Sequence, residues 1–471
     1  MANRYLLRKP TEAFAADLEG RGGALRRALG PIDLVLLGIG CIIGTGIFVL
    51  TGVAAVNHAG PAVIASYAVA GVACGLAAIC YSEFATMLPI SGSAYSYAYA
   101  TLGELVAWII GWDLILEYAL AASAVAVGWS GYVRDILSGF GLSIPNAIAG
   151  APGTVEGGVF NLPACLILLV MTTLLVIGIR ESARTNAVIV AIKIFVVGFV
   201  IVAGLGYVQP ANWSPFAPFG WNGIMAGAAT VFFAYIGFDA VTTAAEEARH
   251  PERDMTIGIL GSLGVCTLLY LMVAAVVTGM VPLAEIDTSA PVAQAFRSHG
   301  LSAAAGLISA GAIAGLTSVL LVLLLGQSRI FFSMSRDGLL PPVFSRVHAR
   351  FGTPHLSTIL VGGVVSLIAG FVPLKELAEL ANIGTLFAFV IVAAGIVVLR
   401  RTQPDLPRPF RTPWVPWTPI LTVLACGYLM AALPAATWLR FVIWLVIGIA
   451  VYGLYGRRHS RVARSAAAAA R

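Results

Sequence analysis

The chain has 471 residues, of which 59% are hydrophobic and only 11% are charged, and its formal net charge is +6. Together with a mean hydropathy of +0.92, this composition excludes a sizeable soluble domain and indicates an all-α polytopic membrane protein. The positive charge does not require a nucleic acid partner, because basic residues that face the cytosol lie against anionic lipid headgroups.

Residues 1–31 form a basic arm ahead of the first apolar run. The arm is too long, too mixed in charge and too poor in a cleavage site to be a secretory signal, so the first helix is expected to be retained. When every predicted helix crosses the membrane, most of the 28 Lys and Arg residues fall on the same side as the arm. The positive-inside rule therefore predicts cytoplasmic N- and C-termini in a multi-pass protein of the plasma membrane.

Apolar runs of about 20 residues, separated by Gly, Pro and charged residues, predict about twelve transmembrane helices. The predicted spans are residues 32–56, 61–88, 103–133, 162–180, 183–207, 222–246, 256–280, 301–334, 355–373, 377–400, 416–436 and 438–456. The third and eighth spans are longer than a bilayer requires, so they are expected to tilt or to extend beyond it.

Two of these spans contain glycine-rich sequences that a membrane helix should not contain. They are GIGCIIGTGIF, from Gly38 to Phe48, and FFAYIGFDA, from Phe232 to Ala240. Glycine weakens a helix, and the backbone groups that it frees are tolerated at membrane depth only where protein or a water-filled cavity satisfies them. The alternative is that these glycines only allow close helix packing. We expect helices 1 and 6 to be unwound in the middle, around a solute site near the bilayer midplane.

The spacing of the two breaks also predicts how the chain is organised. They are five helices apart, and a repeat with an odd number of helices inverts its membrane orientation. The predicted organisation is a cytoplasmic arm (1–31), a first five-helix repeat (32–207), a second five-helix repeat (222–400), a cytoplasmic Pro/Arg-rich loop (401–415), two further helices (416–456) and a basic tail (457–471).

Five ordered sequence blocks resemble one family of transporters. LGPIDLVLLGIGCIIGTGIFVLTG (29–52) and FFAYIGFDAVTTAAEEARHPERDMTIGI (232–259) are similar to the amino acid-polyamine-organocation (APC) superfamily. YSEFATMLPISGSAYSYAY (81–99), SRIFFSMSRDGLLP (328–341) and RTQPDLPRPFRTPWVP (401–416) resemble its cationic amino acid transporter family, especially the bacterial members. The resemblance covers residues 25 to 456 and implies the APC fold, with a 5+5 inverted repeat, and secondary amino acid transport by alternating access.

The residues at the breaks suit a zwitterionic α-amino acid. Backbone N–H groups and a hydroxyl in Gly44-Thr45-Gly46 can seat a carboxylate at the start of a half-helix. Carbonyl groups freed around Ile42 and Ile43 and around Phe233, Ala234 and Ile236, with Gly237 in the same turn, can accept from an ammonium group. The resemblance implies that Thr45 and Gly46 bind the carboxylate, that Ile42 and residues 233–236 bind the amine, and that Phe233 acts as an aromatic lid.

Lys193 lies near the middle of a predicted span. A charged ammonium at the bilayer centre costs about 2.5 to 3.5 kcal/mol, so the side chain must face the bundle, find a partner or lose its proton. The resemblance implies that this lysine stands where sodium-coupled relatives hold a cation, in a proton-coupled branch. The alternative is a permanently charged bridge between helices.

Three carboxylates within the predicted spans are candidate partners for proton coupling. Asp113 and Glu117 are four residues apart on one helix face, so they can look at the same cavity. Asp239 directly follows the second break, and with Glu117 it is the favoured partner; for Asp113 a solvated position at the inner edge of its helix is an open alternative. Glu83 and Arg329, at the predicted inner ends of helices two and eight, are a possible intracellular gate; the alternative is that they only reach the interface.

No nucleotide-binding, zinc-protease or hydrolase motif is found, so neither an enzyme nor a cofactor or metal is expected. The leading interpretation is a permease that imports an amino acid with protons. An exchanger or polyamine permease without net proton coupling is the alternative within transport, and a membrane amino acid sensor is the alternative from another class. Cationic and small neutral substrates are both open, as is the oligomeric state.

Overall fold

The computed structural model describes residues 7–9, 28–87, 93–178 and 183–464, and within these ranges every regular element is a helix and no β-strand forms. Most of the predicted N-terminal arm (1–31), residues 88–92 of the block at 81–99, and the end of the predicted tail (457–471) lie outside the described residues. The all-helical prediction is confirmed for the described part of the chain.

The α-helices are α2 (Pro31–Ile42), α3 (Thr51–Ala54), α4 (Val63–Met87), α5 (Ser93–Thr101), α6 (Glu104–Gly139), α7 (Asn146–Ala149), α8 (Leu162–Ile177), α9 (Ala183–Leu205), α10 (Gly220–Val231), α11 (Pro251–Met280), α12 (Pro291–Ser298), α13 (Ser302–Arg336), α14 (His355–Phe371), α15 (Leu374–Thr402), α16 (Trp417–Ala431), α17 (Ala435–Val451) and α18 (Arg457–His459). Short 3₁₀ or π segments connect or extend them: η2 (Gly46–Leu50), η3 (Ala55–Ala59), η4 (Gly60–Ala62), η5 (Pro210–Trp213), η6 (Phe232–Tyr235), η7 (Asp239–Glu247), η8 (Leu283–Glu285), η9 (Pro342–Ser345) and η10 (Tyr452–Gly456).

Eight helical stretches in the described residues are long and apolar enough to cross a membrane. Four shorter apolar helices accompany them: α2, α8, α14 and α16. The chain is therefore a multi-pass membrane protein. The longest uninterrupted helices, α6 and α13, have 36 and 35 residues. At 1.5 Å per residue each is about 50 Å long, well beyond a hydrocarbon core of about 30 Å.

Helix α6 continues past the predicted end of its span at residue 133, through Arg134 and Asp135. These charged residues find partners at the edge of the bundle. Arg134 donates to Ser289, and Asp135 pairs with Arg297 of α12 and accepts from Ser309 of α13. Such partners lie far away in the sequence, so the prediction ended the helix just before Arg134 and Asp135, and the structure extends it.

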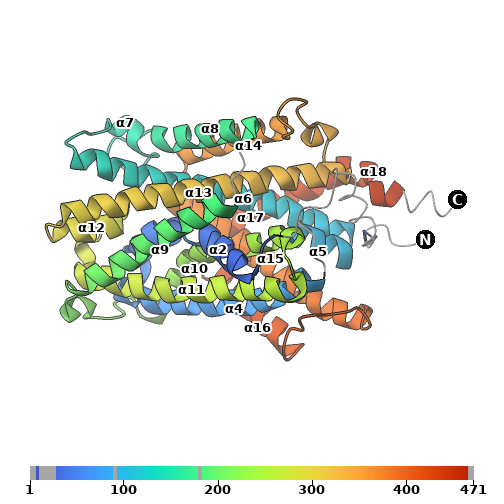
Figure 1. Cartoon of the computed structure of the whole chain (residues 1–471), viewed down its shortest axis with the longest axis horizontal. Coiled ribbons are helices and arrows are strands. Elements are labelled where there is room, and N and C mark those ends of the chain that lie inside the picture. The colour runs from blue at the N-terminus through green and yellow to red at the C-terminus, as the bar shows by residue number, and fades with distance from the viewer. Residues whose placement is uncertain (1–6, 10–27, 88–92, 179–182, 465–471) are drawn as a thin grey trace.

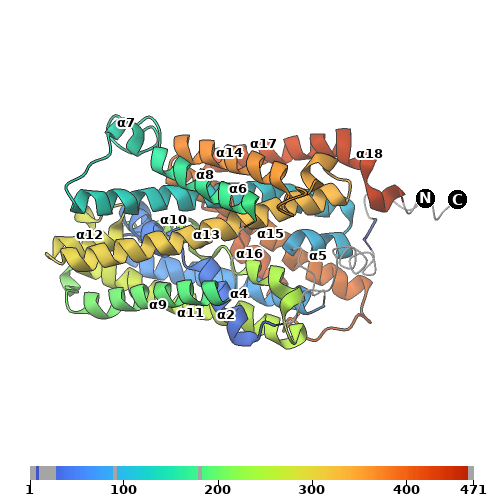
Figure 2. The same cartoon turned by 45° about the horizontal axis from the view of Figure 1, so that its top comes forward.

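The long helices pack around α6 and α13, which lie against each other along the molecule (Figure 1). Helix α2 packs against α9 and α11. Helices α8 and α14 pack against each other and against α6 (Figure 2). Helices α5 and α18 are at one end of the molecule, and α7 and α12 are at the opposite end.

Residues near both termini meet at the end that holds α5 and α18, which we call the terminal end. Lys9 forms a buried ion pair with Asp337, at 2.6 Å. The backbone N–H of Arg461 donates to the Asp337 carbonyl at 3.0 Å. Asp337, just after α13, thus links segments from the two ends of the chain, through its side chain to Lys9 and through its backbone carbonyl to Arg461.

Candidate functional site

The first helix interruption follows α2. The helix ends at Ile42, Ile43 takes extended backbone angles (φ −73°, ψ 100°), and helical geometry resumes in η2 at Gly46. A Cβ atom on Gly46 would overlap Ala234 of η6. The glycine is required because the two interruptions touch each other at this point.

The second interruption follows α10. Segment η6 ends at Tyr235, Ile236 is extended (ψ 135°), and Gly237 has φ +111°, a conformation that favours glycine. A Cβ on Gly237 would stand 3.1 Å from the carbonyl oxygen of Cys41. Both interruptions therefore lie inside the sequence stretches that predicted them, and they are adjacent in space.

Side chains from neighbouring helices satisfy carbonyl groups at and beside these interruptions. The donors are Tyr270 to Ile42 and to Ala234 (both 2.8 Å), Lys193 to Gly40 (2.6 Å), Tyr67 to Gly46 (2.9 Å), Tyr132 to Phe48 (2.6 Å) and Asn382 to Ala229 (2.7 Å). A membrane core offers no solvent for freed backbone groups, so such donors are what allows the helices to break here. Sequence reasoning missed the tyrosines and Asn382, because a single tyrosine in an apolar run reads as a core residue.

Two narrow cavities adjoin at the interruptions and share the lining residues Cys41, Ala121, Ile236, Val319 and Leu323. The one that we call the backbone cavity is also lined by Ile42, Gly44, Thr45, Gly46, Val125 and Phe233. The carboxylate cavity is also lined by Glu117, Tyr118, Gly237, Asp239, Ala240 and Val322. Each has room for about one water molecule. An amino acid would fit only if the surrounding side chains moved apart.

Most of the predicted binding residues come together in the backbone cavity. Thr45 is fully buried, and its hydroxyl has no hydrogen-bond partner among the described residues. Two predicted residues do not line either cavity. Ile43 donates its backbone N–H to Ile39, and Ala234 contributes a carbonyl that Tyr270 already contacts.

The carboxylates divide between the carboxylate cavity and the protein beside it. Glu117 and Asp239 both line that cavity, and Glu117 interacts electrostatically with Asp239 and with Asp113. Asp113 lines neither cavity, is fully buried, and has no hydrogen-bond partner at either carboxylate oxygen among the described residues. The alternative of a solvated Asp113 is therefore wrong, because the helices around α6 cover the side chain.

Lys193, on α9, lies behind the first interruption rather than in either cavity. Its ammonium group donates to the Gly40 carbonyl, near the end of α2, and the whole side chain is buried. A Cβ on Gly315 of α13 would stand 3.1 Å from the lysine Cε. The lysine stem therefore lies between the broken helix and α13.

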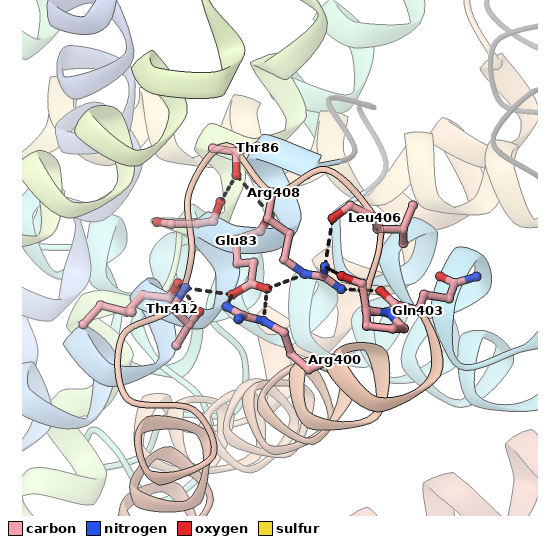
Figure 3. A network of polar contacts seen from close by, with 10 residues as sticks. Glu83, Thr86, Arg400, Gln403, Leu406, Arg408 and Thr412 are labelled. Carbon is pink, nitrogen blue, oxygen red and sulfur yellow. Dashed lines mark hydrogen bonds and ion pairs between the residues drawn. The ribbon is translucent and has the colours of Figure 1, made fainter.

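Glu83, near the C-terminal end of α4, forms ion pairs with Arg400 and Arg408 (Figure 3). Arg400 donates to both carboxylate oxygens, at 2.8 and 2.9 Å, and the backbone N–H of Thr412 adds a third bond at 2.7 Å. Arg408 is in turn wrapped by carbonyl oxygens of its own loop. The other predicted gate residue, Arg329, lies on α13. Among the described ion pairs, those of Glu83 tie α4 to α15 and the loop that follows it.

The side chains that surround the two cavities were also missed by sequence reasoning. On α6 and α13 they are small or aliphatic: Ala121, Val125, Val319, Val322 and Leu323. Such residues cannot be assigned to a site from their spacing, because every face of a membrane helix is apolar. In the described part of the chain, no cluster of three or more His, Cys, Asp or Glu side chains could hold a metal ion.

Comparisons of the sequence with known proteins find similar transporters. A sequence model of amino acid permeases matches residues 29–453. A methylthioribose transporter of Bacillus subtilis (strain 168) is 52% identical over 453 residues, covering 96% of this chain and 98% of the relative. A branched-chain amino acid permease of the same organism is 52% identical over 442 residues, or 93% of this chain and 95% of the relative. Human cationic amino acid transporter 4 is 39% identical over 397 residues, or 82% of this chain and 62% of the relative.

Proposed function

We propose, from the premise that this chain belongs to the amino acid permease family of the APC superfamily, that it imports an amino acid together with a proton across a bacterial plasma membrane. Amino acid transport follows from the family. Proton symport, alternating access and the orientation with cytoplasmic termini are our proposals, as are the twelve-helix count, the 5+5 inverted repeat and the predicted domain limits. The contact between the two helix interruptions, where Gly46 lies against Ala234, supports the repeat.

The observation that carries the proposal is the hydroxyl of Thr45, which has no hydrogen-bond partner among the described residues. It is buried against the backbone cavity where η2 begins, and a buried hydroxyl without a partner is unfavourable unless a ligand completes it. A substrate carboxylate there would accept from this hydroxyl and from backbone N–H groups of the Gly44–Gly46 turn. Thr45 and Gly46 are the proposed carboxylate site.

The substrate ammonium is proposed to bind the carbonyl oxygens of the same turns. Tyr270 has one hydroxyl proton but contacts two carbonyls, those of Ile42 and Ala234. One of them therefore keeps acceptor capacity at any moment, and a carbonyl oxygen has two lone pairs. Phe233, which lines the cavity, is the proposed lid.

The lining favours a neutral substrate with an aliphatic side chain. Val125, Val319 and Leu323 would surround that side chain, and burying apolar surface stabilises binding by about 25 cal/mol per Å². The relative named a branched-chain amino acid permease is in line with this choice. A cationic substrate is the competing case, with Glu117 and Asp239 as its counter-charges.

Coupling to protons is proposed to pass through Lys193, with Glu117 and Asp239 as partners. The ammonium holds the Gly40 carbonyl at the end of α2, so a lysine that lost its proton would loosen the broken helix. An intracellular gate at Glu83 and Arg329 is part of the proposal. The pairing of Glu83 with Arg400 and Arg408 supports a closed terminal end in this conformation.

A second candidate function is transport of a thioether sugar. The methylthioribose transporter is as similar to this chain as the branched-chain permease is. The carboxylate cavity offers Glu117 and Asp239, and carboxylates are good acceptors for sugar hydroxyl groups. A sugar lacks the zwitterion, however, and would leave the Thr45 turn without its charged ligand.

The test is uptake into proteoliposomes of radiolabelled leucine, alanine, arginine and methylthioribose, with and without an inward proton gradient, for the wild type and for Thr45→Ala and Lys193→Ala. We expect gradient-driven leucine accumulation, binding of every amino acid weakened in Thr45→Ala, and loss of accumulation with some binding left in Lys193→Ala. Uptake of methylthioribose alone would favour the second candidate. Exchange that ignores the gradient in all variants would favour an exchanger, and binding without uptake would favour a sensor.

A further inference from the structure

Asp113 is a buried carboxyl group that the proposed mechanism does not yet use. It lies one helical turn from Glu117 on α6, on the side toward Glu104 and the terminal end. Its side chain is fully buried, and neither oxygen has a hydrogen-bond partner among the described residues. An ionised carboxylate without partners is far more costly at membrane depth than a neutral acid. In this conformation the group is therefore a carboxylic acid that carries a proton.

The cover over Asp113 is a glycine of α15. A Cβ on Gly384 would stand 2.7 Å from the Asp113 Oδ1 atom. The backbone of α15 thus lies directly on the carboxyl group, and any larger residue would hold the helix away. If α15 separates from α6 at this point, the carboxyl group becomes hydrated.

The same stretch of α15 is joined to the second helix interruption. Asn382, two residues before Gly384, donates to the carbonyl groups of Ala229 and Thr230, at the end of α10. Those carbonyls directly precede η6, which carries Phe233. A rearrangement of the second interruption around a substrate would therefore pull on the part of α15 that covers Asp113.

We propose that Asp113 is a proton-carrying residue of the transport cycle, which releases its proton toward the terminal end when α15 moves away from α6. In that step the O–H bond of the carboxylic acid breaks, the proton passes to water, and the carboxylate stays hydrated until it is reprotonated. The inference rests on the proposed proton symport.

The charged and titratable neighbours fit this role. Glu117 is the neighbour on the same helix, with Asp239 of η7 beyond it, and both border the carboxylate cavity. Arg329 of α13 interacts electrostatically with Tyr118 of α6. Helix α15 presents Gly384 at the contact. Because the side chain is shielded from water, the neutral acid is favoured, and a proton is held here until water enters.

The experiment compares wild type, Asp113→Asn and Glu117→Gln in proteoliposomes with radiolabelled leucine. The asparagine keeps the shape and neutrality of the protonated acid but cannot release a proton, and Asp113 lines neither cavity. We expect leucine exchange within about twofold of wild type. With an imposed gradient of one pH unit, accumulation should fall about tenfold, which is the driving force of one coupled proton. Exchange in this variant should also lose its dependence on internal pH.

Two results would overturn the inference. Accumulation and pH dependence like those of wild type would make Asp113 a neutral spacer, and loss of exchange together with accumulation would make it a structural group. Glu117→Gln is the matched comparison, because it also replaces an acid by its amide on the same helix face. Glu117 borders a cavity and is a proposed coupling partner, so this variant should weaken leucine affinity as well as accumulation, whereas Asp113→Asn should affect accumulation alone. A wild type that exchanges leucine without responding to the gradient would instead refute proton symport, and this inference would fall with it.

Discussion

Carboxylates near the terminal end and one carboxyl group beside the cavities, that of Asp113, are equally buried, yet they are held in opposite ways. The terminal carboxylates are Glu83, Glu104 and Asp337, and the central carboxylates are Asp113, Glu117 and Asp239. Each terminal carboxylate accepts from donors on other segments, whereas Asp113 accepts from none among the described residues. A carboxylate that accepts from several donors holds their segments together, because neutralising it would leave some of those donors without an acceptor. A carboxylate without donors is free to change its charge.

The largest effect is expected at Glu83, which joins two arginines and a backbone N–H. Replacing it in Glu83→Gln leaves the Arg400 and Arg408 guanidinium groups without their counter-charge, and breaking a buried ion pair costs roughly 3 to 5 kcal/mol. The free energy of unfolding in mixed micelles measures this loss. The matched control is Glu376→Gln, whose partner Arg440 is 2.7 Å away but half-exposed, so its loss should be under about 1 kcal/mol. Equal losses in both variants would remove the distinction.

The next largest effect is expected for Glu104→Gln, with a loss of about 2 to 3 kcal/mol in the free energy of unfolding. The carboxylate accepts from Tyr99 at 3.1 Å and from Tyr452 at 2.9 Å, and also from Ser460. The amide keeps one oxygen acceptor, so one of the hydroxyl groups would face an N–H group instead. Tyr452→Phe removes a single donor and should cost about 1 kcal/mol in the same unfolding assay. A variant at Glu104 as stable as wild type would mean that this end of the chain is not fixed by its carboxylates.

In the central region the residue that holds segments together is a tyrosine rather than a carboxylate. Tyr270→Phe keeps the ring contacts with Tyr67 and Tyr235 but removes the hydroxyl that contacts Ile42 and Ala234. A buried carbonyl without a donor costs about 1 to 2 kcal/mol, and the two turns should also lose their alignment for substrate. Leucine binding and unfolding, measured on the same sample, should both weaken. Weakened unfolding with unchanged binding would separate the tyrosine from the substrate site.

The sequence was sufficient to locate the broken helices, because glycine clusters and extended turns are local properties of the chain. It was not sufficient to find their supports. Tyr270 contacts Ile42 across 228 residues of sequence and Asn382 contacts Ala229 across 153, and nothing in their own segments marks them as donors. The spacing of Asp113 and Glu117 placed both on one helix face, but it could not show that their surroundings differ. Gly384 of α15 covers Asp113, whereas Glu117 borders a cavity. In the same way, the charge of Glu83 was evident from the sequence, but its partners were not, because they come from the end of α15 and the following loop.

The smallest effect is expected at Asp113, and that small effect is the most informative. Asp113→Asn removes an acid that is already neutral and has no donors to lose among the described residues, so unfolding should change by less than about 1 kcal/mol. The comparison with Glu83→Gln uses the same chemistry, an acid replaced by its amide at a fully buried position in a helix. A loss at Asp113 as large as the loss at Glu83 would mean that the aspartate is ionised and has a counter-charge. If the loss is small, this carboxyl group is not needed to hold the fold together. Its burial in the membrane then requires a functional reason, because an ionisable group there is costly. A proton that binds and leaves during transport is the simplest such reason.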